Sequence, residues 1–128
     1  MSTLKVTNIQ DTAGGNSSTS EEIYSGRAKA WVNFNGVGTV AIRADFNVNS
    51  ITDNGGNGDY TVNFTTAMPD ANYCVTGTCS GADNPSSPVA ILNTKLTGGL
   101  TTTGCRIYST NTSGAAANRE FIAVAIFR

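Results

Sequence analysis

The stretch KAWVNFNGVGTVAIRADFNV, residues 29–48, alternates apolar and polar side chains with a period of two. Its first part places three apolar side chains on one face: Ala30, Val32 and Phe34. Its second part, residues 39–49, continues the alternation with a longer apolar set: Val40, Ile42, Ala44, Phe46 and Val48. Alternation over runs of this length predicts strands with one buried face. A two-stranded ribbon is only marginally stable alone, so the rest of the chain must cover that face.

The segment Asn35-Gly36-Val37-Gly38 separates the two parts of this ribbon. The pair Asn35-Gly36 supplies residues that accept the positive φ angles of a tight hairpin turn. The sequence therefore predicts a hairpin that turns at this pair and continues unbroken to residue 49.

Further strands are expected at residues 60–65, 73–79, 89–96 and 101–110. The last expected strand, residues 121–127, is apolar on both faces, so it is either central in a sandwich or covered by another subunit. Small side chains at Ala123 and Ala125 on one of those faces suggest close approach of another surface. The fold expected is all-β, an antiparallel, jelly-roll-like β-sandwich with a separate extended strand at the N-terminus.

The N-terminal part has a different pattern from the body. Residues 4–9 are expected to form a short strand, and residues 11–22 read as a Gly- and Ser-rich linker, mobile or extended. The predicted division is an N-terminal strand and flexible linker over residues 1–22 and a sandwich domain over residues 23–128. The apolar Leu4 and Val6 must dock somewhere, and the protein's own sheet, a neighbouring chain and a larger assembly all remain open.

The chain has 128 residues and a formal charge of −1, and its Ser, Thr, Asn and Gly residues add up to 57. This composition favours strands joined by turns. The charges are scattered singly, which argues against nucleic acid and anionic membranes as partners. The first residues lack the apolar run of a signal peptide, and no stretch has the length of a membrane helix. We therefore expect synthesis in the cytoplasm without membrane insertion.

Three cysteines, Cys74, Cys79 and Cys105, leave one thiol over in any pairing. Reduced, buried thiols are the preferred interpretation. A disulfide between Cys74 and Cys105 is the alternative if the protein is oxidised after release from the cell.

Catalysis is not expected. The chain has no histidine, which removes the usual general base and the common zinc sites. Its carboxylates have no partner at a spacing that glycan cleavage would require, and no cofactor is expected. Asp53 and Asp59 flank a run of Asn and Gly that could hold calcium, but the same run is a complete hairpin signal, so no metal site is predicted.

Two groups of residues are candidates for binding. Trp31 lies among the polar positions of its strand, which suits a subunit contact better than a ligand platform, and it joins the N-terminal and closing-strand residues in an expected oligomer interface: Leu4, Val6, Trp31, Ala123 and Ala125. The expected ligand-binding group combines an accessible aromatic ring with polar loop residues: Tyr108, Arg106, Asp83, Asn84 and Asn111.

Several stretches resemble one known group of proteins. Residues 2–6, STLKV, and residues 25–36, SGRAKAWVNFNG, resemble the start of small tail-fibre proteins of marine bacteriophages, with a cyanophage-like distal fibre domain. Residues 59–73, DYTVNFTTAMPDANY, look like the strand, turn and strand of many distal fibre domains. The pairing of the Thr101–Gly104 entry with a hydrophobic closing strand is also similar, so the resemblance covers most of the chain.

This resemblance implies a β-sandwich that assembles as a homotrimer on a virion tail and contacts a receptor on the bacterial surface, often a glycan. The N-terminal segment would attach the protein to other tail proteins, and no shared catalytic residue is implied. The expected function is a phage tail-fibre or receptor-binding component that adheres to its host without catalysis. A structural tail adaptor or decoration protein, and a free-standing lectin-like module, remain as alternatives.

Overall fold

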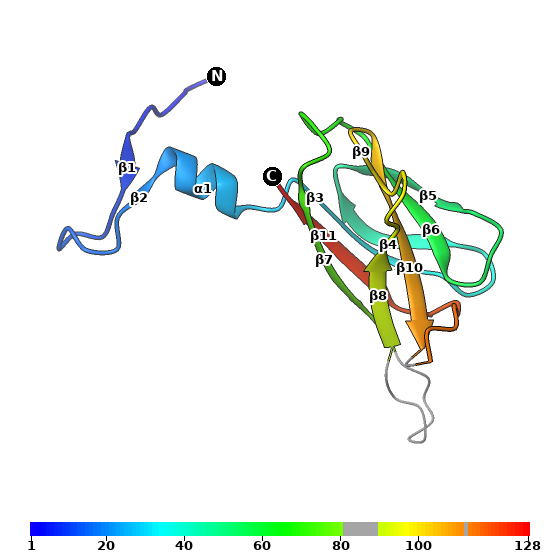
Figure 1. Ribbon diagram of the computed structural model, residues 1–128. Helices are drawn as coiled ribbons and strands as arrows, with labels where there is room; N and C mark the ends of the chain where they lie inside the picture. Colours follow the sequence, from blue (N-terminus) through cyan, green and yellow to red (C-terminus); the bar gives the residue numbers. More distant parts are fainter. Residues whose placement is uncertain (81–89, 112) are drawn as a thin grey trace.

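Two antiparallel sheets pack face to face in the computed structural model, which describes residues 1–80, 90–111 and 113–128 (Figure 1). One sheet has the order β4-β3-β11-β7, formed by Ala41–Phe46, Ala30–Asn35, Ile122–Phe127 and Cys74–Cys79. The other has the order β5-β6-β10-β8, formed by Val48–Asp53, Asp59–Phe64, Gly104–Asn111 and Ala90–Thr94, and the short β9 (Leu100–Thr101) also pairs with β10. The predicted all-β class with antiparallel sheets is confirmed, and the jelly-roll connectivity stays a prediction.

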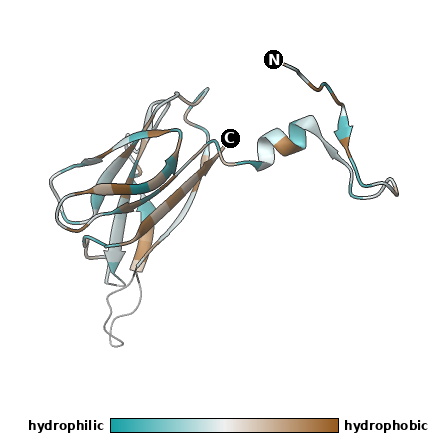
Figure 2. Cartoon of the chain, turned by 180° about the vertical axis from the view of Figure 1, so that it is seen from behind, coloured by the Kyte–Doolittle hydropathy of each residue, from teal (hydrophilic) through white to brown (hydrophobic). Residues whose placement is uncertain are grey.

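The inner faces of the two sheets form the core that the alternation predicts. Val32 and Phe34 from β3 meet Tyr60 and Val62 from β6, and all four are buried. The rings of Phe34 and Tyr60 meet edge to face with centroids 5.2 Å apart. The closing strand β11 is hydrophobic over its length (Figure 2), with alternate residues buried in this core and the others on its outer face.

The predicted ribbon is correct for its pairing and wrong for its length. β3 and β4 pair antiparallel, but the register shifts at a bulge between Asn33 and Phe34. This shift places Phe46 opposite Trp31 on the outer face, so Phe46 is 53% exposed instead of buried. The strand then ends at Asn47, where a φ of 56° redirects the chain, and β5 joins the opposite sheet.

The turn after β3 also differs from the prediction. The positive φ expected at Asn35-Gly36 occurs at Gly38, with φ 66°. Gly36 is required for space, because a Cβ there would lie 2.5 Å from Tyr60 Oη and 3.0 Å from the Arg119 carbonyl oxygen. The Tyr60 hydroxyl donates to the Gly36 carbonyl at 2.7 Å, which fixes the turn against the core.

The N-terminal arm, residues 1–26, is more ordered than predicted. The expected strand over residues 4–9 is reduced to β1 (Asn8–Ile9), which pairs with β2 (Ser18–Thr19). The expected linker ends in a helix, α1 (Ser20–Gly26), which begins with a capping box. In that box Glu22 N donates to Thr19 Oγ1 at 3.1 Å and Thr19 N donates to Glu22 Oε2 at 2.7 Å. No residue of α1 is buried, and the arm projects from the sandwich (Figure 1).

All three cysteines are free thiols, so the alternative disulfide between Cys74 and Cys105 is not formed. Cys105 faces the core of one sheet, whereas Cys74 pairs with Phe127 on the other sheet and is exposed. The prediction of buried thiols is therefore correct for Cys79 and Cys105 and wrong for Cys74. Burial raises the pKa of Cys105 to about 12. Among the described residues, no helix is long and apolar enough to cross a membrane.

Gly36→Ala is expected to lower the free energy of unfolding by about 2 kcal/mol, because the new methyl group would overpack the space beside Tyr60. Urea unfolding of the variant and the natural chain measures the difference. Gly26→Ala is the matched control, since a Cβ there meets nothing within 4 Å. Equal stability of Gly36→Ala and the natural chain would contradict this account of the turn.

Deletion of residues 1–20 is expected to leave the sandwich folded, because none of these residues belongs to the core. Scanning calorimetry should show one cooperative transition with a Tm close to that of the full chain. Loss of the cooperative transition would instead make the arm part of the folding unit.

Candidate interface and ligand surfaces

The outer face of the sheet β4-β3-β11-β7, here called the apolar face, carries aromatic and small side chains. Register places Trp31 between Phe46 on β4 and Ala125 on β11, and Ala125 opposite Thr76 on β7. Directly opposed residues of antiparallel strands share a face. Trp31 is 39% exposed, so its indole ring stands on this face in contact with solvent.

A hollow of about 460 Å³ lies in the apolar face, beside Trp31. Its lining includes small or uncharged side chains from three strands: Asn33, Thr76, Thr78, Ala123 and Ala125. Within the described part of the chain, the buried Oδ1 atom of Asn33 has no hydrogen-bond partner. A buried acceptor without any donor costs about 1–3 kcal/mol.

The predicted interface residues are brought together in part. Trp31, Ala123 and Ala125 gather on the apolar face. Leu4 and Val6 are exposed on the arm, and Figure 1 shows that segment beyond α1, away from the sandwich. The structure therefore places the five residues in two separate regions.

The outer face of the opposite sheet is polar. Arg106 on β10 makes a bidentate ion pair with Asp59 on β6, with Nε–Oδ1 and Nη2–Oδ2 distances of 2.7 and 2.6 Å. Asn54 donates to the same carboxylate at 3.0 Å. Asp59 is only 7% exposed, and the hydrogen bonds from Arg106 outweigh burial and lower its pKa to about 2.

Amide and hydroxyl groups continue across this polar face. Asn63 on β6 donates to Ser50 Oγ at 3.1 Å and to Thr52 Oγ1 at 2.9 Å on the neighbouring strand β5. These side chains satisfy one another while they remain open to water. The two sheets thus present outer surfaces of opposite character.

The residues predicted to bind a ligand do not form one group in the structure. Arg106 and Tyr108 are neighbours, with the guanidinium carbon 6.0 Å from the Tyr108 ring centroid, but Asp59 already engages Arg106. Asn111 Oδ1 accepts from the amides of Ser113 and Ala115 at 3.0 and 2.9 Å, so it shapes its own turn. Asp83 and Asn84 lie outside the described residues.

Asp53 and Asp59, the two carboxylates considered as calcium ligands, both have hydrogen-bond partners within the protein. Asp53 Oδ1 accepts from the Gly55 amide at 2.9 Å, which supports the hairpin between β5 and β6. Asp59 is held by Arg106. Residues 53–59 therefore form the hairpin turn between β5 and β6 that the Asn and Gly residues indicate.

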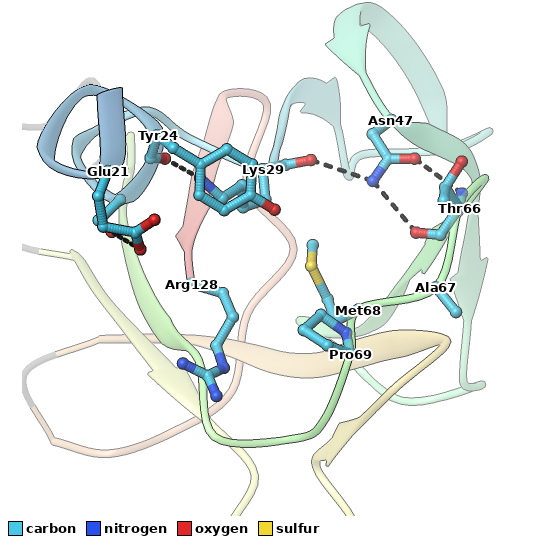
Figure 3. Close-up of a pocket in the computed structure, with 10 residues that line it drawn as sticks. Glu21, Tyr24, Lys29, Asn47, Thr66, Ala67, Met68, Pro69 and Arg128 are labelled. Atoms are coloured by element: carbon cyan, nitrogen blue, oxygen red, sulfur yellow. Dashed lines mark hydrogen bonds between the residues drawn. The ribbon is translucent and has the colours of Figure 1, made fainter. Parts of the chain in front are cut away.

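A cavity of about 360 Å³ lies where α1 meets the sandwich, and it is here called the junction cavity (Figure 3). α1 contributes Glu21, Tyr24 and Ser25, and the sandwich contributes the other wall: Lys29, Asn47, Thr66, Ala67, Met68, Pro69 and Arg128. Lys29 Nζ lies 3.6 Å from the centroid of the Tyr24 ring and donates to the Tyr24 carbonyl. On the opposite wall Arg128 binds Asp70 through two hydrogen bonds of 2.9 and 2.6 Å.

Sequence reasoning missed this cavity. The predicted boundary between linker and sandwich, after residue 22, falls inside α1, although the pattern Thr19-Ser20-Glu21-Glu22 is the signature of a capping box and indicates a helix. No sequence signal brings Arg128 at the C-terminus next to α1, because this proximity follows from the pairing of β3 with β11.

Comparison with family models, curated proteins and solved structures finds no match to this chain. Its function therefore has to be inferred from its own surfaces and from the resemblance of its sequence stretches. The arrangement offers a face that is mainly apolar around Trp31, with the charged Arg43 and Glu120 paired at one end of the same sheet, and a mixed polar cavity.

Asp59→Asn is expected to lower the free energy of unfolding by about 2 kcal/mol at pH 7, because it removes the charge that Arg106 stabilises. The pKa of Asp59 is lowered on folding from 3.8 to about 2. Its stabilising contribution is thus complete above about pH 5 and is lost as the pH falls through 3.8 towards 2.

Urea unfolding at a series of pH values tests this expectation. The natural chain should lose more stability than Asp59→Asn between pH 5 and pH 2. Asp70→Asn serves as control, since its pair with Arg128 is more exposed and contributes less. Parallel pH profiles for the natural chain and Asp59→Asn would exclude a stabilising role for this ion pair.

Proposed function

We propose that this protein is a homo-oligomeric, non-catalytic component of a bacteriophage tail, a tail-fibre or receptor-binding protein that adheres to the bacterial surface. The observation that carries the proposal is the apolar face, a four-stranded surface with exposed aromatic rings and uncharged small side chains. A second copy of the chain is the partner that would cover it.

The physical reason for self-association is the cost of leaving the apolar face in water. Sheet faces in contact with solvent are normally polar, as the outer face of β5-β6-β10-β8 is. Aromatic side chains are enriched in protein interfaces, and charged residues are depleted from interface cores. Contact with a second copy would bury the exposed rings of Trp31 and Phe46.

The assignment to a phage tail is supported by the resemblance of residues 2–6, 25–36 and 59–73 to tail-fibre proteins, which also implies a trimer. The projecting arm suits attachment to other tail proteins, because its exposed Leu4 and Val6 are available to a partner. With only the segment around Leu4 and Val6 on other tail proteins, the polar face and the junction cavity, whose helical wall begins at Glu21, remain for a receptor on the bacterial surface.

The alternatives can be distinguished by binding assays with the purified full chain. A receptor-binding component should bind host cells and block infection by its phage. An adaptor or decoration protein should bind isolated virion parts and leave infection unchanged when added in excess. A lectin-like module should bind sugars without binding virion parts.

Ala125→Glu is expected to produce monomers or insoluble protein, because it places a charge in the centre of the apolar face. Size-exclusion chromatography with light scattering, at high protein concentration, gives the mass of the particle. Asn93→Glu is the matched control, since Asn93 lies on the exposed outer face of the other sheet and should leave the oligomer intact.

A soluble Ala125→Glu oligomer of unchanged mass would contradict this use of the apolar face. A natural chain that remains monomeric at high concentration would overturn the oligomeric part of the proposed function itself.

A further inference from the structure

We propose that the junction cavity binds a neutral saccharide, a mono- or disaccharide unit of a larger glycan. The source of the glycan, the bacterial surface, rests on the proposed function. The choice of a neutral saccharide as the ligand rests on the residues that line the cavity. It places the ligand at Tyr24 and Arg128, not at the Arg106 and Tyr108 pair that the sequence suggested.

The size and walls of the cavity suit a small polar molecule with apolar patches. Its volume of about 360 Å³ falls within the range of small-molecule sites, about 300–1,000 Å³. Met68 and Pro69 supply apolar surface, and the Tyr24 ring, 52% exposed, stands on the opposite wall (Figure 3). Sugar rings present C–H groups on one face, and such groups pack against aromatic and apolar surfaces.

Polar groups of both kinds converge on the same space. Arg128 engages Asp70 through Nε and Nη2, which leaves Nη1 for another acceptor. Glu21 accepts from Ser25 through Oε1, which leaves Oε2 for a donor. A ligand that both donates and accepts at several positions matches this set, and hydroxyl groups do both.

The charge of the lining favours a neutral ligand over an anion. Lys29 Nζ already donates to the carbonyl oxygens of Tyr24 and Arg27, and Arg128 is paired with Asp70. Glu21 adds a negative charge to the helical wall. The two cations of the lining, Lys29 and Arg128, are thus balanced by Glu21 and Asp70, so an anionic group would meet no net positive charge and would approach a carboxylate.

Both walls are held in place before a ligand arrives. Asn47 Nδ2 donates to the Lys29 and Thr66 carbonyls at 3.0 and 3.2 Å, and Thr66 N donates to Asn47 Oδ1 at 2.7 Å. Lys29 Nζ lies against the Tyr24 ring and donates to the Tyr24 carbonyl, which favours one orientation of this exposed side chain. Such preorganisation reduces the entropy lost on binding.

The test is an NMR titration of the ¹⁵N-labelled full chain with the methyl glycosides of glucose, galactose, mannose and N-acetylglucosamine. N-acetylneuraminic acid serves as the anionic comparison. At least one neutral glycoside is expected to shift the amide signals of Ser25, Thr66 and Ala67. Tyr24→Ala should weaken that binding about tenfold or more, because it removes the stacking surface.

Tyr108→Ala is the matched control and should bind as the natural chain does, since Tyr108 lies on the polar face. The proposal is overturned if no neutral glycoside shifts these signals, if only N-acetylneuraminic acid binds, or if Tyr108→Ala and not Tyr24→Ala abolishes binding. Light scattering on the same sample separates the two ideas. A monomer that binds sugar contradicts the proposed oligomer alone, and an oligomer that binds none contradicts the saccharide site alone.

Discussion

The sandwich depends on the corner at Asn47. Its left-handed backbone sends the chain from β4 in one sheet to β5 in the other, and its side chain binds Lys29 before β3 and Thr66 after β6. The Thr65 amide also donates to the Asn47 carbonyl at 3.2 Å. One residue thus connects the beginnings and ends of four strands, and it also forms part of the wall of the junction cavity. Asparagine suits this position because it tolerates a positive φ and carries both a donor and an acceptor.

Side chains alternate between the core and the outer face in both sheets, but the two outer faces differ in the side chains they carry. Side chains of the polar face form hydrogen bonds with one another. Arg106 pairs with Asp59, and the amide of Asn63 donates to the hydroxyl groups of Ser50 and Thr52. The face of the other sheet instead exposes the aromatic rings of Trp31 and Phe46, and its pair between Arg43 and Glu120 is longer, at 3.8 Å. This asymmetry, more than overall hydrophobicity, is what distinguishes the protein's two outer faces.

The strands were predictable because a period of two is a local property, readable at β3 and β6 without knowledge of their partners. Phe46 was wrongly expected to be buried because a bulge opposite Asn33 and Phe34 changes the face of later residues, and nothing local marks it. The ion pair between Arg106 and Asp59 joins residues 47 positions apart, so it requires the strand register. α1 is a different case, because its capping box was present in the sequence, within a segment whose Gly and Ser content suggested a linker.

The position of β3 has a consequence for how the protein would bear a load. The arm enters the sandwich at the beginning of β3, which is bonded to β4 on one side and to β11 on the other. A pull on the arm along the strand axis therefore strains both rows of hydrogen bonds in shear, and many must break together before the strand slips. An edge strand under the same pull could be peeled away one bond at a time. The arm is thus joined to a strand that is paired on both sides and not to an edge strand.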